Sequence, residues 1–115
     1  MNEKAKYWIE LSDYDVETAS AMLDSKRYLY VGFMCHQAIE KIFKAYFSNF
    51  NNEPPPFSHS LSYLAEKCGL GNKLSDIQIG FLNEVEPLNI EARYPSHKKN
   101  LLKSLTVEKC KYFIN

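Results

Sequence analysis

A long stretch with apolar residues at helical spacing, free of glycine and proline, opens the sequence and constrains the fold most. It runs from Asn2, whose side chain can cap a helix, to the polar turn at 24–26. A second stretch with similar spacing follows, from about Arg27 to Phe50. Two long helices joined by a tight turn pack as an antiparallel hairpin. The sequence therefore predicts a helical hairpin over residues 2–50.

A proline run and a short helix are predicted after the hairpin. The run Pro54–Pro56 cannot continue a helix and favours extended geometry. Apolar residues then recur at helical spacing from about Ser60 to Cys68, and Gly69 follows them. Because glycine commonly ends a helix, the sequence predicts a short third helix that stops there.

Two more helices are predicted in the second half of the chain. Ser75 and Gln78 have the spacing of a capping box, which opens the fourth helix. Pro87 kinks or ends this helix, and if it ends it, Leu88–Ala92 forms a separate turn. Thr106 is placed to cap the last helix, whose apolar residues also recur at helical spacing.

The pattern as a whole predicts an all-α fold. No segment alternates apolar and polar residues as a half-buried strand does, and no internal repeat is present. A length of 115 residues is that of one domain. We therefore expect residues 1–115 to form a single antiparallel, up-and-down bundle of four to five helices.

Charge and hydropathy exclude several classes of protein. The chain has 14 basic and 14 acidic residues, so it lacks the overall field of a nucleic-acid or membrane-surface protein, and any anion site must be local. Its N-terminus lacks the apolar core of a signal peptide, and the longest apolar run, residues 28–35, is too short to span a bilayer. We expect a cytoplasmic protein with no membrane segment.

The cysteines indicate reduced thiols. Cys35, Cys68 and Cys110 are odd in number and far apart, and none belongs to a cluster with zinc-like spacing. Free thiols are typical of cytosolic proteins. The sequence therefore predicts no metal, and nothing in it predicts a cofactor.

A family resemblance appears in the second predicted helix. Residues 37–45, with the sequence QAIEKIFKA, resemble the core of the HEPN domain (higher eukaryotes and prokaryotes nucleotide-binding domain). Three further features of that family recur in the same order, and together the four motifs cover nearly the whole chain. They are Asp15-Val16, His59-Ser60-Leu61 and Arg93-Tyr94-Pro95.

The resemblance implies a bundle of four or five helices that commonly forms a homodimer. Such domains are often encoded beside a minimal nucleotidyltransferase, as half of a toxin–antitoxin-like pair. Some members are metal-independent ribonucleases, in which an arginine and a histidine with four to six residues between them act across a dimer cleft. Others lack that motif and bind nucleotides or protein partners.

Arg93 and His97 are the candidate catalytic pair. Only three residues separate them, one fewer than the ribonuclease motif of the family requires. Pro95 also disfavours helical geometry for Tyr94, so that the two side chains are not expected on one continuous helix face. Metal-free RNA cleavage needs a fixed arginine and a positioned base. The sequence therefore favours a non-catalytic role and leaves the ribonuclease as an alternative.

The same corner can bind an anion. The Arg93 guanidinium suits bidentate binding of phosphate, the Tyr94 ring can stack on a base, and Lys98 adds positive charge. Lys41 and Lys44 are expected to support this nucleotide or anion site. The alternative is that Arg93 binds helix carbonyls or a carboxylate and that the lysines are solvated.

The polar stripe of the second helix has two interpretations. Gln37, Glu40, Lys41 and Lys44 share one face, with the i, i+4 spacing of ion pairs. Spacing alone predicts a solvated face, whereas the resemblance places the stripe at a cleft that a dimer mate or ligand approaches. We expect Gln37 and Glu40 to be structural polar residues.

Two further polar residues are expected to be structural. Asp15 lies at an otherwise apolar position, and a buried carboxylate needs a partner, for which Lys41 and Arg27 are the candidates. His59 lies just before the third helix, where an imidazole can bind free amides or its own turn.

The sequence thus leads to a first prediction and two alternatives. The first is a non-catalytic HEPN domain that binds a nucleotide or RNA, or serves a nucleotidyltransferase partner, as a homodimer. The alternatives are a ribonuclease that uses Arg93 and His97, and a structural dimerisation module without a ligand.

Overall fold

The structure is a computed structural model that describes residues 2–51, 53–93 and 106–114. Within these ranges the chain forms five helices and no strand. The prediction of an all-α helical bundle is confirmed. The helices are α1 (Glu3–Asp24), α2 (Tyr28–Phe50), α3 (Leu61–Lys67), α4 (Asp76–Arg93) and α6 (Val107–Ile114).

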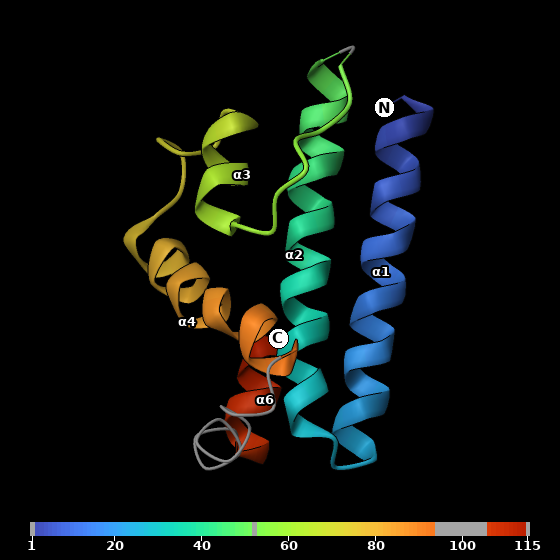
Figure 1. Cartoon of the computed structure of the whole chain (residues 1–115), viewed down its shortest axis with the longest axis vertical. Helices are drawn as coiled ribbons and strands as arrows, with labels where there is room; N and C mark the ends of the chain where they lie inside the picture. Colours follow the sequence, from blue (N-terminus) through green and yellow to red (C-terminus); the bar gives the residue numbers. More distant parts are fainter. Residues whose placement is uncertain (1, 52, 94–105, 115) are drawn as a thin grey trace.

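The first two helices form the predicted hairpin. They lie side by side along their whole length and run in opposite directions (Figure 1). The Ala5 amide donates to the side-chain oxygen of Asn2 at 2.8 Å, so Asn2 caps α1 as predicted. The chain then reverses at Lys26, whose φ of 61° is left-handed.

The other predicted helix starts are also present. The Tyr63 amide donates to the Ser60 hydroxyl, 3.3 Å away, at the start of α3. Ser75 and Gln78 form the reciprocal capping box, with each backbone amide donating to the other's side chain at 2.9 and 3.1 Å. The Lys109 amide donates to the Thr106 hydroxyl at 3.1 Å and opens α6.

Pro87 does not end its helix, and the prediction of a separate turn over 88–92 is wrong. The fourth helix, α4, continues through the proline to Arg93. A proline in a helix leaves the carbonyl four residues earlier without its donor, but here that residue, Asn83, is exposed to water. Leu88, directly after the proline, is only 4% exposed and packs against Gly32 of α2. This burial holds the last part of α4 in the bundle.

The second helix, α2, is the centre of the fold. It contacts α1, α3, α4 and α6, and α6 also contacts α1 (Figure 1). The core consists of apolar side chains from all five helices. Its buried members include Ala19, Val31, Cys35, Phe43, Leu61, Leu64, Val85, Leu88, Cys110 and Phe113.

Candidate functional site

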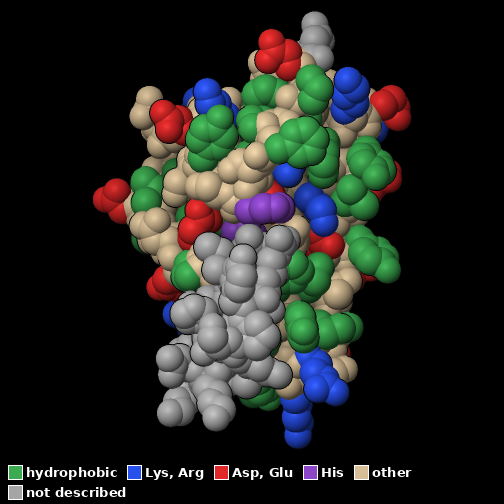
Figure 2. All heavy atoms as spheres, in the orientation of Figure 1, with side chains coloured by type: hydrophobic (Ala, Val, Ile, Leu, Met, Phe, Trp, Pro, Cys, Tyr) green, Lys and Arg blue, Asp and Glu red, His purple; other side chains and the backbone are tan. Residues whose placement is uncertain are grey.

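Ionisable side chains from α1, α2, α4 and the segment before α3 meet beside α2. They are close to one another although the chain separates them by up to 71 positions, from Asp15 to Glu86. Figure 2 shows histidine on this face of the molecule beside basic and acidic side chains. We call these side chains the polar cluster; they are Asp15, His36, Glu40, Lys41, Lys44, His59 and Glu86.

The polar stripe of α2 is not a solvated face. Glu40 is only 2% exposed, and the side chain of Lys44 is 14% exposed. Gln37 is partly buried as well. The stripe is covered because α1 and the segment before α3 lie against it, as the ion pairs of Glu40 and Lys41 with those elements show.

Asp15 of α1 pairs with Lys41 of α2, one of the two partners predicted for it. The Lys41 ammonium donates to the Asp15 carboxylate, whose side chain is 7% exposed. One turn earlier on α1, the buried Ser12 hydroxyl donates to the Ala38 carbonyl of α2 at 2.8 Å. These two polar contacts fix the register of the hairpin.

Glu40 holds two donors on a single carboxylate oxygen. Its Oε1 lies 2.7 Å from Nδ1 of His59 and 3.4 Å from Nζ of Lys44. The same Lys44 ammonium lies 5.5 Å from the centre of the Trp8 ring, within the range of a cation–π contact. Glu40 therefore connects α2 to the segment before α3.

The sequence led us to expect that His59 binds free amides of α3 or its own turn, but its partner in the structure is Glu40. The Leu61 amide instead donates to both carboxylate oxygens of Glu86, at 3.1 and 2.9 Å, and the Tyr63 amide donates to Ser60. With those amides occupied, the imidazole turns to the buried Glu40 carboxylate.

Glu86 and the buried His36 form the inner part of the polar cluster. His36 is fully buried, and its Nε2 lies 3.5 Å from Oε2 of Glu86, too far for a good hydrogen bond. Neither ring nitrogen has a hydrogen-bond partner among the described residues. Burial lowers the pKa of His36, and the negative charges of Glu40 and Glu86 oppose this in part. A buried, neutral imidazole follows.

Sequence reasoning missed both of these residues. Glu86 lies four positions after Leu82 and one after Val85, on the apolar face of α4, and this position is a signal that it turns inward. His36 lies next to Cys35 on α2 and gives no such signal. Its burial depends on how α4 packs against α2.

The residues predicted to bind an anion are not brought together by the described part of the chain. Lys41 and Lys44 are paired with the carboxylates of Asp15 and Glu40. Arg93 is the last residue of α4. Tyr94, His97 and Lys98 lie outside the described residues.

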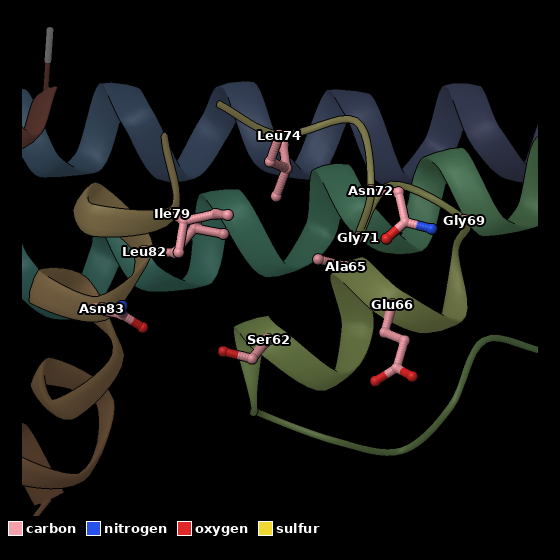
Figure 3. A pocket seen from close by; sticks show the side chains of 10 residues that line it. All are labelled: Ser62, Ala65, Glu66, Gly69, Gly71, Asn72, Leu74, Ile79, Leu82 and Asn83. Carbon is pink, nitrogen blue, oxygen red and sulfur yellow. The ribbon is translucent and has the colours of Figure 1, made fainter. Parts of the chain in front are cut away.

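Two of the hollows among the described residues bear on function and lie outside the polar cluster. The first, of about 420 Å³, lies between α3 and α4 (Figure 3), where Ser62 and Asn83 face one another and the Glu66 carboxylate points away. The second, of about 600 Å³, is a mainly apolar groove between α1, α2, α4 and α6. We call it the apolar groove; its lining includes Val16, Ile39, Ile42, Phe81, Tyr112 and Phe113.

Within residues 2–51, 53–93 and 106–114, no three His, Cys, Asp or Glu side chains are placed to hold a metal ion. In the same ranges, no helix combines the length and the hydropathy needed to cross a membrane. The three cysteines are free thiols and are buried.

Comparison with known proteins gives one family. The model of the HEPN domain family matches residues 5–115, which is nearly the whole chain. No curated protein and no solved structure matches the chain.

Proposed function

The chain belongs to the HEPN domain family, and from this premise we propose that it is a non-catalytic accessory domain. In this proposal it binds the phosphate of a nucleotide or of RNA, or serves a minimal nucleotidyltransferase in a toxin–antitoxin-like pair. It acts as a homodimer.

The pairing within the polar cluster is the observation that carries the non-catalytic role. Asp15 neutralises Lys41, and Glu40 accepts from both Lys44 and His59. Paired charges where several elements meet suit a structural role, because each charge compensates its partner for the cost of leaving water. This supports a cluster that holds the helices together.

Phosphate binding is proposed for the corner that begins at Arg93. A guanidinium at the end of α4 suits bidentate binding of phosphate, and the residues that follow in the sequence add the Tyr94 ring and the Lys98 charge. Lys41 and Lys44 support the site only if phosphate replaces their present carboxylate partners.

The apolar groove supports the partner role. Several of the apolar side chains at its edge are exposed, and apolar surface of this kind is typical of protein interfaces. They are Val16, Ile42, Ile77 and Tyr112, at 38%, 42%, 84% and 45% exposure. A second copy of the chain or a nucleotidyltransferase is the proposed occupant.

Thermal unfolding with a panel of nucleotides and short RNAs tests the phosphate site. A specific ligand at a hundred times its Kd should stabilise the fold by about 2.7 kcal/mol and raise Tm accordingly. Arg93→Ala should remove this rise. Arg27→Ala is the matched control, because it removes the chain's other arginine, whose side chain makes no capping bond at α2.

Two further measurements separate the alternatives. Incubation with tRNA and mRNA in a chelator should give no cleavage; cleavage that His97→Ala abolishes would replace the proposal with the ribonuclease. Light scattering should give the mass of a dimer. If no nucleotide, RNA or nucleotidyltransferase binds while the dimer persists, the chain is a structural dimerisation module.

A further inference from the structure

His59 is held at the surface by a carboxylate from the interior. Its Nδ1 lies 2.7 Å from Oε1 of Glu40. The His59 side chain is 54% exposed, whereas that of Glu40 is 2% exposed. The ring therefore has one edge bound to a buried acceptor and the rest of its surface open to solvent.

This contact determines which ring nitrogen carries the proton. A carboxylate only accepts hydrogen bonds, so Nδ1 of His59 must donate to Glu40. In a neutral imidazole the other nitrogen, Nε2, then carries the lone pair. Because Nδ1 contacts the buried Glu40 and the side chain is 54% exposed, we take Nε2 as the ring nitrogen that a substrate can reach. A base or nucleophile oriented by a third group is the recurring arrangement of reactive histidines.

The surroundings of the ring favour a substrate with a transferable anionic group. The Lys44 ammonium lies 3.4 Å from the same Glu40 oxygen that His59 contacts, so a cation lies close to the imidazole. Negative charge that arrives on the ring can attract this ammonium away from Glu40. The paired carboxylate also stabilises positive charge on the ring during a transfer.

The second described histidine provides a comparison within the chain. His36 is fully buried, and its nitrogens have no access to solvent. Although it lies near Glu86, the closest approach is 3.5 Å, so no carboxylate fixes its tautomer by a good hydrogen bond. Of these two histidines, only His59 combines an exposed ring with a carboxylate that fixes its tautomer.

We propose that Nε2 of His59 is a phosphoryl-accepting atom and that His59 is a modification site for small phosphoryl donors, such as phosphoramidates and acyl phosphates. The Nε2 lone pair attacks phosphorus and forms an N–P bond. The bond from phosphorus to the leaving group breaks, and the leaving group departs with that electron pair. With phosphoramidate the leaving group is ammonia. Nδ1 keeps its proton, which stays bonded to Glu40.

Phosphoramidate is the probe for this site. The folded protein should gain one phosphoryl group on His59, measured by mass spectrometry of the intact chain and its peptides. Phosphorus NMR distinguishes the two phosphohistidine isomers and should show the Nε2 form. His59→Gln should abolish this signal, and His97→Gln should leave it unchanged.

The role of Glu40 is tested by rates. Glu40→Gln should slow modification of His59 by about tenfold, which corresponds to about 1.4 kcal/mol at the transition state. Because this buried substitution can also disturb folding, the wild-type chain in urea is the second test. Unfolding separates His59 from Glu40 and should slow the modification by a similar factor.

Two results would overturn the proposal. The first is equal or faster modification of His59 in the unfolded chain, which would mean that the fold does not activate the ring. The second is phosphoryl transfer to Nδ1 in the folded protein, which would mean that Glu40 does not hold that nitrogen. Neither result depends on whether the domain binds nucleotides.

Discussion

Leu88 of α4 occupies the space in which a side chain at position 32 of α2 would lie. A Cβ placed on Gly32 would be 2.7 Å from Cδ1 of Leu88, closer than such atoms approach in proteins. Both residues are buried, Leu88 at 4% exposure. The absence of a side chain at Gly32 therefore lets α4 approach α2 closely just after Pro87.

We expect Gly32→Ala to destabilise the protein. Alanine favours a helix over glycine by about 0.5–1 kcal/mol, but overpacking in a core costs typically about 1–3 kcal/mol. The free energy of unfolding should fall by about 1–2 kcal/mol, measured by urea unfolding followed by circular dichroism. Leu88→Ala should cost less in the Gly32→Ala background than in the wild type, because it removes the clash.

Gly80 provides the matched control for that prediction. It also lies inside a helix, α4, but nothing lies within 4 Å of a Cβ placed there. Gly80→Ala should therefore raise the free energy of unfolding by about 0.5–1 kcal/mol. If Gly32→Ala stabilises the protein as much as Gly80→Ala does, Leu88 does not restrict the space at position 32.

Lys41→Met should destabilise the protein because it leaves the Asp15 carboxylate buried without its partner. Breaking a buried pair costs about 3–5 kcal/mol, and the 22% exposure of Lys41 reduces this to about 1–3 kcal/mol. Urea unfolding measures the loss. Asp15→Leu together with Lys41→Met should recover most of it, because no unpaired charge remains.

A surface lysine tests whether that loss is specific to the buried pair. Lys6 pairs with Glu3 on the exposed face of α1, with side chains 57% and 94% exposed. Lys6→Met should change stability little, because exposed pairs contribute little. Equal losses for the two lysines would mean that Lys41 and Asp15 contribute no more than a surface pair.

Protein stability should fall as the pH is lowered, because the pKa of His36 is lower in the folded protein than in the unfolded chain. Burial lowers its pKa in the folded protein, against an opposing effect of Glu40 on α2 and Glu86 on α4, while His59 before α3 lowers it further. The unfolded chain has the ordinary value of 6.5, so below that pH it binds a proton that the folded chain does not. The free energy of unfolding should therefore be unaffected by His36 above pH 6.5 and should decrease by up to about 1.4 kcal/mol per pH unit below it.

Urea unfolding at a series of pH values measures this slope. His36→Gln should flatten it, because the substitution removes the group whose pKa differs between the two states. His59→Gln should leave most of the contribution of His36 in place, because His59 has the smallest effect on the pKa of His36. An unchanged slope in His36→Gln would show that another group causes the dependence.

The native thiols should resist alkylation. Burial, with a smaller effect of Cys110, raises the pKa of Cys35 to about 12, and burial also raises the pKa of Cys68 and Cys110. The thiolate is the reactive form of cysteine. Iodoacetamide at neutral pH should therefore label the folded protein no faster than local unfolding exposes the thiols. All three cysteines should react promptly in urea. Rapid labelling of any of them in the native protein would contradict their burial.

Local signals in the sequence determined the helices. Asn2, Ser75 and Thr106 each cap a helix where their spacing predicts, because a cap depends only on residues within one turn. The same holds for the hairpin, whose turn lies between two long apolar stripes. The all-α fold follows from local patterns of this kind.

Proline and histidine show the limit of local signals. Pro87 predicts a kink or an end, and the structure excludes the end, because α4 continues to Arg93. Leu88 is buried against Gly32 of α2, a contact between helices that the local sequence does not reveal. His59 lies just before α3, but the Leu61 amide of that helix already donates to Glu86, which is 25 positions further along the chain. The imidazole therefore binds Glu40 instead.

The sequence by itself determined the helices, their caps and the Asp15 carboxylate's need for a partner. Only the tertiary structure decided that Lys41 is this partner, that Glu40 is buried under His59, and that His36 has no access to water. The physical reason is the range of the interactions: hydrogen bonds within a helical turn are encoded by neighbours, whereas burial and charge pairing between helices depend on how α1, α3 and α4 pack around α2.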